Sequence, residues 1–240
     1  MNTAKLIGGE DTAAALWQGL RVPLIEGPAV GARLVVIAPH PDDEVLACGG
    51  LLALHAAAGG ACLVLAVTDG EASDRQASPS RLAAVRRIER VRGLQRLGLA
   101  ASCVHRLGLP DGQVGHRTAA LVDAITPVLH PSDWVVATWR HDGHPDHDAT
   151  GLAAAQACAA TGSRLVEAPV WMWHWASPAD ERVPWQRLRA LPLTTWVLRR
   201  KQQALVAHAS QWAPRLGGQA PVLDAAMRAR ALRPHEYFFV

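Results

Sequence analysis

Long apolar runs are missing from this sequence, and so is an N-terminal leader pattern. No stretch reaches the roughly 18 uncharged apolar residues typical of a membrane-spanning helix, so no transmembrane segment is expected. The first residues lack a basic segment followed by an apolar one, so the sequence predicts no signal peptide. Together these absences predict a cytoplasmic protein without a membrane partner.

Cysteine is scarce, and its spacing carries no motif. The four cysteines lie among apolar residues without forming a CxxC pair; they are Cys48, Cys62, Cys103 and Cys158. This pattern predicts small core residues in a reducing compartment.

A strong charge of either sign is also lacking. The 240 residues carry a formal net charge of +3, and 19% of them are charged, so a nucleic-acid partner is not indicated. One basic stretch contains Arg86, Arg87, Arg90, Arg92 and Arg96. A solvated helix face is the favoured interpretation, with binding of an anionic substrate or partner as the alternative.

Strand and helix patterns alternate through the first two thirds of the chain. The predicted strands are 33–38, 61–68, 102–109 and 133–139, with a further extended segment at 164–175. The predicted helices are 44–58, 81–97, 118–130, 146–160, 194–209 and 221–231. This order predicts one domain over residues 1–240 with a Rossmann-like α/β fold. Its three layers (α/β/α) enclose a mostly parallel sheet, and a helical segment follows at the C-terminus.

Two loops dense in histidine and carboxylate follow the first and fourth predicted strands. One runs over 38–44 and the other over 141–147. The carboxyl ends of parallel strands meet at one edge of an open α/β sheet, where ligands bind. His40 and Asp43 are three residues apart at a loop-to-helix turn, and His147 supplies a third ligand for zinc or another divalent cation.

The residues beside these ligands suit proton transfer. Asp42 is placed to take a proton from water as a general base, and His144 to stabilise or protonate the tetrahedral intermediate. Asp146 can orient His144 or a ligand through a hydrogen bond. The alternative is that the carboxylates only cap the following helices. Capping requires neither His40 nor His147, so the metal site is favoured when both loops are considered.

These motifs resemble those of the PIG-L/LmbE-like family of zinc-dependent N-acetylglucosaminyl deacetylases. The AHPDDE signature stands at 38–44, with Pro39 inserted, and HPDH is intact at 144–147 with Gly151 following. The resemblance implies His40, Asp43 and His147 as zinc ligands, Asp42 as the base and His144 as the acid or oxyanion stabiliser. It implies nothing for His141 or Asp142, because the family varies there.

Weaker similarity extends over about 33–212. Arg75 stands where family members often carry a substrate-contacting arginine. The late family segment matches at Lys201, Ala204, Leu205, His208, Ser210 and Gln211. Trp171, Trp173 and Trp175 would share one face of a strand. Core packing is favoured for them over a platform for a sugar ring.

The predicted function is hydrolysis of an N-acyl, especially N-acetyl, group from an amino sugar conjugate or related amide. The same site also suits an amidase acting on a thiol conjugate or on a glycopeptide sugar. A non-catalytic small-molecule-binding α/β domain is disfavoured because no GxGxxG follows the first strand and Asp42 would then have no role. The sequence predicts a small-molecule partner and leaves homo-oligomerisation open.

Overall fold

A seven-stranded sheet forms the centre of the molecule, in the order β3-β2-β1-β4-β5-β7-β6. The computed structural model describes residues 12, 14–17, 19–29, 31–74, 76–215, 218 and 220–240. The strands are β1 (Leu34–Ala38), β2 (Cys62–Ala66), β3 (Val104–Arg106), β4 (Trp134–Thr138), β5 (Arg164–Ala168), β6 (Leu188–Pro192) and β7 (His235–Phe239). Strands β1 to β5 pair in parallel, and β7 runs antiparallel to β5 and β6.

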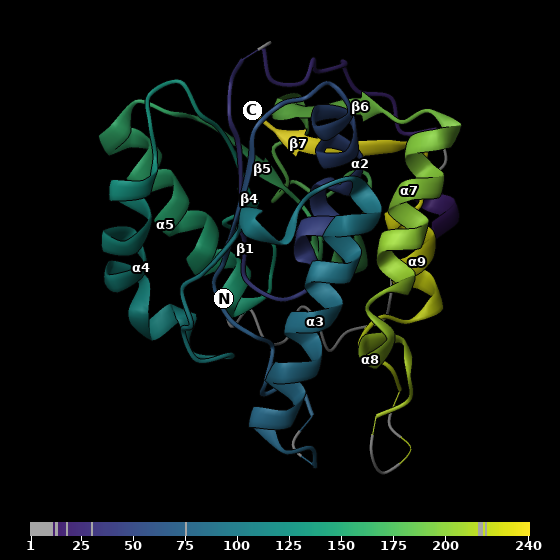
Figure 1. Ribbon diagram of the computed structural model, residues 1–240. Coiled ribbons are helices and arrows are strands. Elements are labelled where there is room, and N and C mark those ends of the chain that lie inside the picture. Colours follow the sequence, from purple (N-terminus) through teal and green to yellow (C-terminus); the bar gives the residue numbers. More distant parts are fainter. Residues whose placement is uncertain are drawn as a thin grey trace.

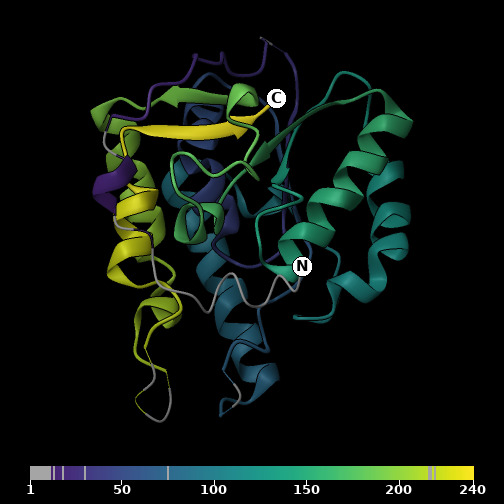
Figure 2. The ribbon, with the colours of Figure 1, turned by 180° about the vertical axis from the view of Figure 1, so that it is seen from behind.

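Helices cover both faces of this sheet, which confirms the predicted α/β architecture. They are α2 (Asp43–Ala57), α3 (Pro79–Leu97), α4 (Thr118–Ile125), α5 (Pro145–Thr161), α6 (Met172–Trp175), α7 (Thr195–Val206), α8 (Ala209–Trp212) and α9 (Ala225–Ala231). Figures 1 and 2 show α4 and α5 on one side of the sheet and α2, α3 and α7 on the other. Short 3-10 turns at Ala14–Trp17, Ala101–Cys103, Val114–Arg117, Thr126–Val128 and Trp185–Arg187 complete the described elements.

The central strands are apolar on both faces because both faces are covered. Leu34 and Val36 pack into the cluster formed with α2, α3 and α7, whereas Val35 and Ile37 pack into the cluster formed with α4 and α5. Strand β1 is buried along its whole length. The chain order reverses between β1 and β4, so the crevice at their carboxyl ends is the position where such sheets bind ligands.

The C-terminal third differs from the prediction. The extended segment predicted at 164–175 is wrong beyond Ala168, because the chain turns into the short helix α6. The Asp142 carboxylate accepts hydrogen bonds from the backbone N–H groups of Val170, Trp171 and Met172, which bend the chain there. The three tryptophans therefore do not share a strand face. Trp173 is buried in the core as favoured, while Trp171 lines a cavity.

The antiparallel pair β6 and β7 was not predicted; its strands lie just before and just after the part of the chain for which helices were predicted at 194–209 and 221–231. Its strand β7 carries Glu236, whose carboxylate accepts hydrogen bonds from Gly50 N (2.6 Å) and Leu51 N (2.8 Å) in α2. These two N–H groups are near a break in the helix at Cys48 (φ −148°, ψ 27°). Lys201 from α7 donates to Glu236 at 2.6 Å and to the Leu46 carbonyl at 3.1 Å. The buried pair Lys201–Glu236 thus holds the interrupted helix that begins at the first histidine-rich loop.

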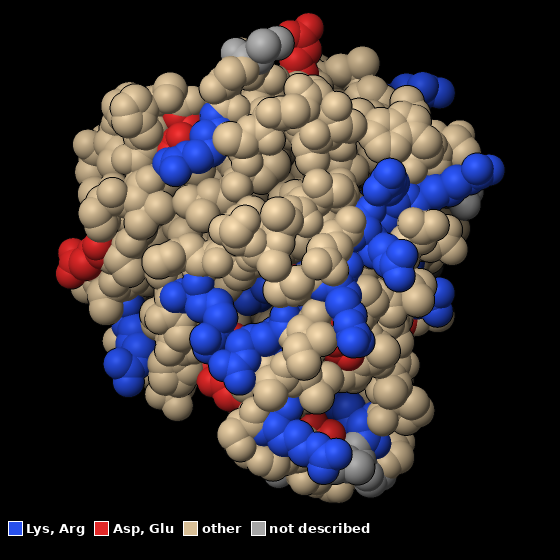
Figure 3. All heavy atoms as spheres, in the orientation of Figure 1, with Lys and Arg blue, Asp and Glu red and all other residues tan. Residues whose placement is uncertain are grey.

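The favoured interpretation of the basic stretch is wrong for two of its members. Arg86 and Arg90 are buried, at 3% and 1% exposure, whereas Arg92 and Arg96 are exposed. Figure 3 shows arginine or lysine side chains gathered on the surface in this view, where α3 and α7 lie. The buried face of α3, which packs against α2, α7 and α8, therefore includes two guanidinium groups.

Three further expectations concern the chain as a whole. All four cysteines are free, and Cys48 and Cys158 are buried. Among the residues that the structure describes, none of the helices combines the length and apolar character needed to cross a bilayer. The single domain over 1–240 stays a prediction.

Candidate active site

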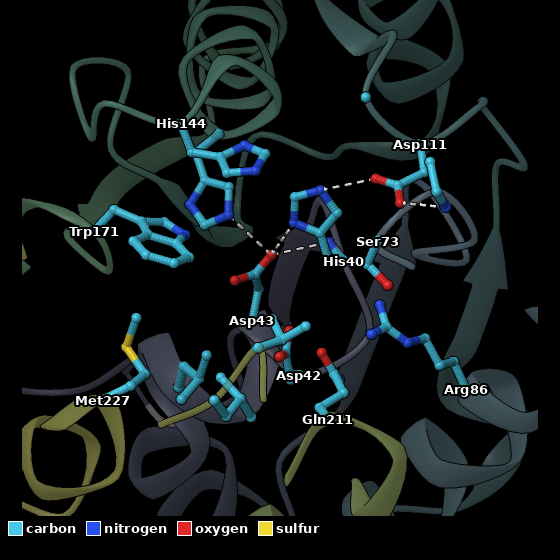
Figure 4. Close-up of a pocket in the computed structure, with 16 residues that line it drawn as sticks. His40, Asp42, Asp43, Ser73, Arg86, Asp111, His144, Trp171, Gln211 and Met227 are labelled. Atoms are coloured by element: carbon cyan, nitrogen blue, oxygen red, sulfur yellow. Dashed lines mark hydrogen bonds and ion pairs between the residues drawn. The ribbon is translucent and has the colours of Figure 1, made fainter. Parts of the chain in front are cut away.

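The two histidine-rich loops meet at the carboxyl ends of β1 and β4, which are neighbouring parallel strands. Ligand atoms of His40, Asp43 and His147 all lie within 4.8 Å of one another. The Asp43 Oδ2 atom is 3.0 Å from His40 Nδ1 and 3.2 Å from His147 Nε2 (Figure 4). The structure thus brings together the three residues predicted as metal ligands.

Close backbone packing sets the position of the second loop. A Cβ atom on Gly151 would lie 2.4 Å from the Thr138 carbonyl oxygen and 2.7 Å from Arg140 N, so only glycine fits there. This contact lets the first turn of α5 approach the end of β4. Pro145 occupies the first turn, where its missing N–H costs nothing, and His144 caps the helix.

A buried carboxylate orients His147. Asp142 Oδ2 is 2.8 Å from His147 Nδ1, and Asp142 is fully buried. This leaves the buried Nε2 atom facing the other two predicted ligands, where Asp43 Oδ2 is 3.2 Å away but the geometry is not that of a hydrogen bond. Burial lowers the pKa of His147, but the carboxylates of Asp43 and Asp142 outweigh burial and raise this pKa to about 9. Metal-ligating histidines usually have such a carboxylate partner.

His40 is oriented in a similar way by Asp146 and Asp111. Its Nε2 atom is 3.3 Å from a carboxylate oxygen of each, while Nδ1 faces Asp43. Asp146 is fixed by hydrogen bonds from Gly112 N (2.7 Å) and Val114 N (3.1 Å). Of the two positions predicted for its carboxylate, Asp146 therefore lies against a predicted ligand rather than against the His144 ring.

Asp42 lines the cavity beside the three predicted ligands and has an unusual backbone. Its φ of 137° is positive, and Asp42 is the only non-glycine residue with positive φ in the described part of the chain. Such a conformation costs about 1–3 kcal/mol and is found preferentially at functional sites. Burial and the neighbouring Asp43 charge raise the pKa of Asp42 well above its usual value, while Arg86 and His40 oppose this shift.

Several contacts hold this strained segment in place. Gln211 Nε2 donates to the Pro41 carbonyl, and Asp42 N donates to Glu44 Oε2 at 3.3 Å. The Asp42 carbonyl accepts from the N–H groups of Val45 and Leu46, both at 2.8 Å. The backbone on both sides of Asp42 is therefore fixed by neighbours.

His144 lies over the same site, with its ring 4.9 Å from that of His40 and 4.8 Å from that of His147. Its Nδ1 accepts a hydrogen bond from Asp146 N at 3.2 Å, which leaves the proton of a neutral ring on Nε2. Burial and the charges of His147 and His40 lower the pKa of His144 to about 3. A neutral His144 can still donate through Nε2 to a developing oxyanion.

The residues enclose a cavity of about 230 Å³. Besides the predicted residues, its polar lining includes Ser73, Arg86, Asp111 and Gln211. Arg75, predicted to contact substrate, lies outside the described residues. Asp142 was given no role from the sequence. Metal-ligating histidines usually have a carboxylate partner, so the acidic residues near His147 were candidates for this role, but their spacing does not say which one makes the contact.

The donor set fits a divalent cation. Two imidazole nitrogens and one carboxylate form a three-ligand set that leaves a coordination position open, as is typical of catalytic zinc. The buried His147 Nε2 also fits this role, because it lies beside Asp43 Oδ2 without a hydrogen bond of good geometry, as expected of a nitrogen that coordinates a cation.

Comparison with known proteins agrees with this geometry. The family model PIG-L, described as GlcNAc-PI de-N-acetylase, matches residues 35–158. The chain belongs to this family. The matched segment contains both histidine-rich loops and ends before α6, so the C-terminal third of this PIG-L protein lies outside the match.

Two curated relatives and one solved structure are similar to this PIG-L chain. Diacetylchitobiose deacetylase of Thermococcus kodakarensis is 27% identical over 140 residues, which cover 54% of this chain and 50% of that protein. 1D-myo-inositol 2-acetamido-2-deoxy-alpha-D-glucopyranoside deacetylase 1 of Catenulispora acidiphila is 28% identical over 153 residues, covering 50% and 46%. The matched part thus spans about half the length of each curated relative.

The solved structure is that of the A40926 pseudoaglycone deacetylase Dbv21. It is 24% identical, has a TM-score of 0.64, and the alignment covers 87% of this chain and 96% of that one. This similarity shows the fold.

Proposed function

We propose that this protein is a zinc-dependent deacetylase that removes the acyl group, in the first instance acetyl, from the nitrogen of an amino sugar. The observation that carries the proposal is the convergence of His40, Asp43 and His147 around one point, with the strained carboxylate of Asp42 beside them. The family membership and the names of the two curated relatives support the same reaction class.

His40 Nδ1, His147 Nε2 and the Asp43 carboxylate would hold the cation. When bound, zinc supplies Lewis acidity and lowers the pKa of a water molecule in the site. Asp142 and Asp146 keep the two imidazoles turned toward that position. Neither carboxylate needs to contact the cation to do this, as is usual for groups that orient metal ligands.

Asp42 accepts a proton from the attacking water as the new C–O bond forms. Its raised pKa matches this task, since a carboxylate with a pKa closer to neutrality is a stronger base. His144 donates a hydrogen bond from Nε2 to the amide oxygen as negative charge develops there. The amide C–N bond then breaks, and the amine leaves with the proton that Asp42 took from water, while the neutral His144 keeps its Nε2 proton. Water and the amide become a carboxylic acid and an amine.

Acetate release is the direct test. The purified protein is incubated with N-acetylglucosamine conjugates in the presence of zinc, and again after removal of metal by a chelator. We expect acetate only with the metal. The Asp42→Asn variant should keep the metal and lose activity, and Asp123→Asn, an exposed aspartate on α4, is the matched control. Release that is insensitive to chelation and to Asp42→Asn would contradict the proposal.

A further inference from the structure

The cavity beside the predicted metal ligands has two chemically different walls. Figure 4 shows Asp111, Ser73 and Arg86 on one side of the Asp43 carboxylate, and Trp171 and Met227 on the other. The apolar residues that line the cavity, called here the apolar wall, are Leu46, Trp171, Val222, Leu223 and Met227. A hydroxylated amine finds hydrogen-bond partners on the polar side and none among the side chains of Leu46, Val222 and Leu223.

The apolar wall is fixed to the same groups that position the predicted catalytic residues. Trp171 N donates at 2.9 Å to Asp142, the carboxylate that also orients His147. Leu223 N donates at 3.0 Å to the backbone carbonyl of Gln211, whose side chain holds the peptide before Asp42. The wall is therefore a built part of the site.

The C-terminal part of the wall is also ordered by its own helix cap. The side chain of Asp224 accepts a hydrogen bond from Met227 N at 2.7 Å and caps α9. Leu223 and Met227 are buried, at 2% and 4% exposure, whereas Leu46 and Val222 remain partly exposed to the cavity. Apolar surface that faces a cavity is best covered by an apolar group of the ligand.

Leu46, Trp171 and Val222 are only partly buried, and an acetyl methyl group is too small to cover all three side chains. We infer that the substrate of this site carries an apolar chain or ring larger than methyl close to the scissile amide, and that the apolar wall binds it. The cavity, about 230 Å³, is smaller than the roughly 300–1,000 Å³ of pockets that enclose drug-sized ligands. The apolar group is therefore of modest size. This inference rests on the proposed function.

The apolar group could belong to the acyl chain or to the aglycone of the amino sugar, and separate arms of one experiment distinguish these two sources. The first arm is a series of N-acyl glucosamines with acetyl, butanoyl and hexanoyl groups. The second arm keeps the N-acetyl group and varies the aglycone from methyl to butyl to phenyl. Full burial of one methylene is expected to raise kcat/KM about fourfold, and partial burial about twofold. A rise in either series supports the inference and names the source of the apolar group.

Variants of the wall test whether it is responsible. Met227→Ser and Val222→Ser should flatten the rising series, and this slope is read within each variant, relative to that variant's own rate with the smallest substrate. Val222 is partly exposed, so its variant should fold even if Met227→Ser does not. Leu152→Ser, at an exposed leucine of α5, is the matched control and should keep the wild-type slope. Two flat or falling series in the wild type, or an unchanged slope in Val222→Ser, would overturn the inference.

A binding measurement separates this inference from the proposed function. The same two series are titrated calorimetrically into Asp42→Asn protein, where turnover is not required. An affinity that rises with apolar size in one series, and no longer rises in the Val222→Ser background, supports the apolar wall even if no substrate is hydrolysed. An affinity independent of apolar size overturns it even if acetate release is observed.

Discussion

Residues 34–161 contribute the three predicted metal ligands, Asp42 and His144, whereas residues 170–240 contribute groups that support or shape the same cavity. Lys201 and Glu236 hold α2, Gln211 holds the peptide before Asp42, and Met227 lines the apolar wall. The first region lies on parallel strands and their following loops, and the second lies on an antiparallel edge and peripheral helices. Substitutions in the first region should therefore change chemistry, and substitutions in the second should change stability or specificity.

The largest effect is expected at Asp42, in the first region. Asp42→Gly and Asp42→Asn should both lower turnover by a factor of about a hundred to ten thousand, as is typical of losing a general base. Asp42→Gly should also raise the free energy of unfolding relative to Asp42→Asn, because glycine accepts a φ of 137° without the strain of about 1–3 kcal/mol. Turnover assays and urea unfolding of both variants measure this. Equal stability of the two variants would mean that the conformation is not strained.

In the second region, substitution of Lys201 should lower stability rather than act on the chemistry directly. Lys201→Met leaves the buried Glu236 carboxylate without its cation, so the free energy of unfolding should fall by about 3–5 kcal/mol. Urea unfolding measures the loss. Arg182→Met breaks the partly exposed pair with Asp180 and should cost about 1 kcal/mol or less. Similar losses of unfolding free energy in the two variants would contradict the role of the Lys201–Glu236 pair in holding α2.

Asp142 links the two regions, because it contacts both His147 and the backbone of 170–172. Asp142→Asn should weaken metal affinity about 10- to 100-fold, the usual cost of losing a carboxylate that orients a ligand. Competition with a chromogenic chelator measures the affinity. Asp148→Asn is a nearby control that keeps the Asp142–His147 contact. Unchanged metal affinity in Asp142→Asn would show that His147 is oriented without this contact.

The smallest effect concerns His208 and acid stability. Burial, together with the charges of Arg90 and Arg86, lowers the pKa of His208 to about 3, below its usual value of 6.5. Below pH 6.5 the unfolded chain binds a proton that the folded protein does not, so this histidine destabilises the fold as the pH falls from 6.5 toward 3. Between pH 7 and 5.5 it should cost about 1 kcal/mol. Urea unfolding should show a weaker pH dependence in His208→Gln than in the wild type, and no change in the exposed His105→Gln control.

The sequence predicted the first region much better than the second. Apolar runs such as 34–38 identify buried parallel strands, and two histidine-rich loops at strand ends place the predicted ligands at one sheet edge. The C-terminal third depends on contacts between distant residues. The Asp142 carboxylate accepts hydrogen bonds from the backbone where the segment after β5 turns into a helix, and Glu236 in β7 accepts hydrogen bonds from the interrupted helix α2. Neither contact can be predicted from a local sequence pattern.

The burial of Arg86 and Arg90 was not predicted, although the helical periodicity of the sequence indicates it. Arg86, Arg90, Gly93 and Leu97 recur at helical spacing, so they share the face of α3 that contains the buried Leu94. The periodicity therefore places two arginines on the buried face, although their charge favours solvent. Asp111 follows β3 at the same sheet edge as the two histidine-rich loops. Its contact with His40 could be predicted only once the strand order was known.

The contact between Gly151 and the end of β4 has a consequence for how a cation would bind. Because backbone meets backbone there, the position of α5, and with it of His147, relative to the end of β4 is set when the chain folds, and no flexible side chain can relax it. The conformational entropy of placing this predicted ligand is then lost during folding and would not oppose cation binding. Addition of zinc should therefore leave the backbone of α5 unchanged.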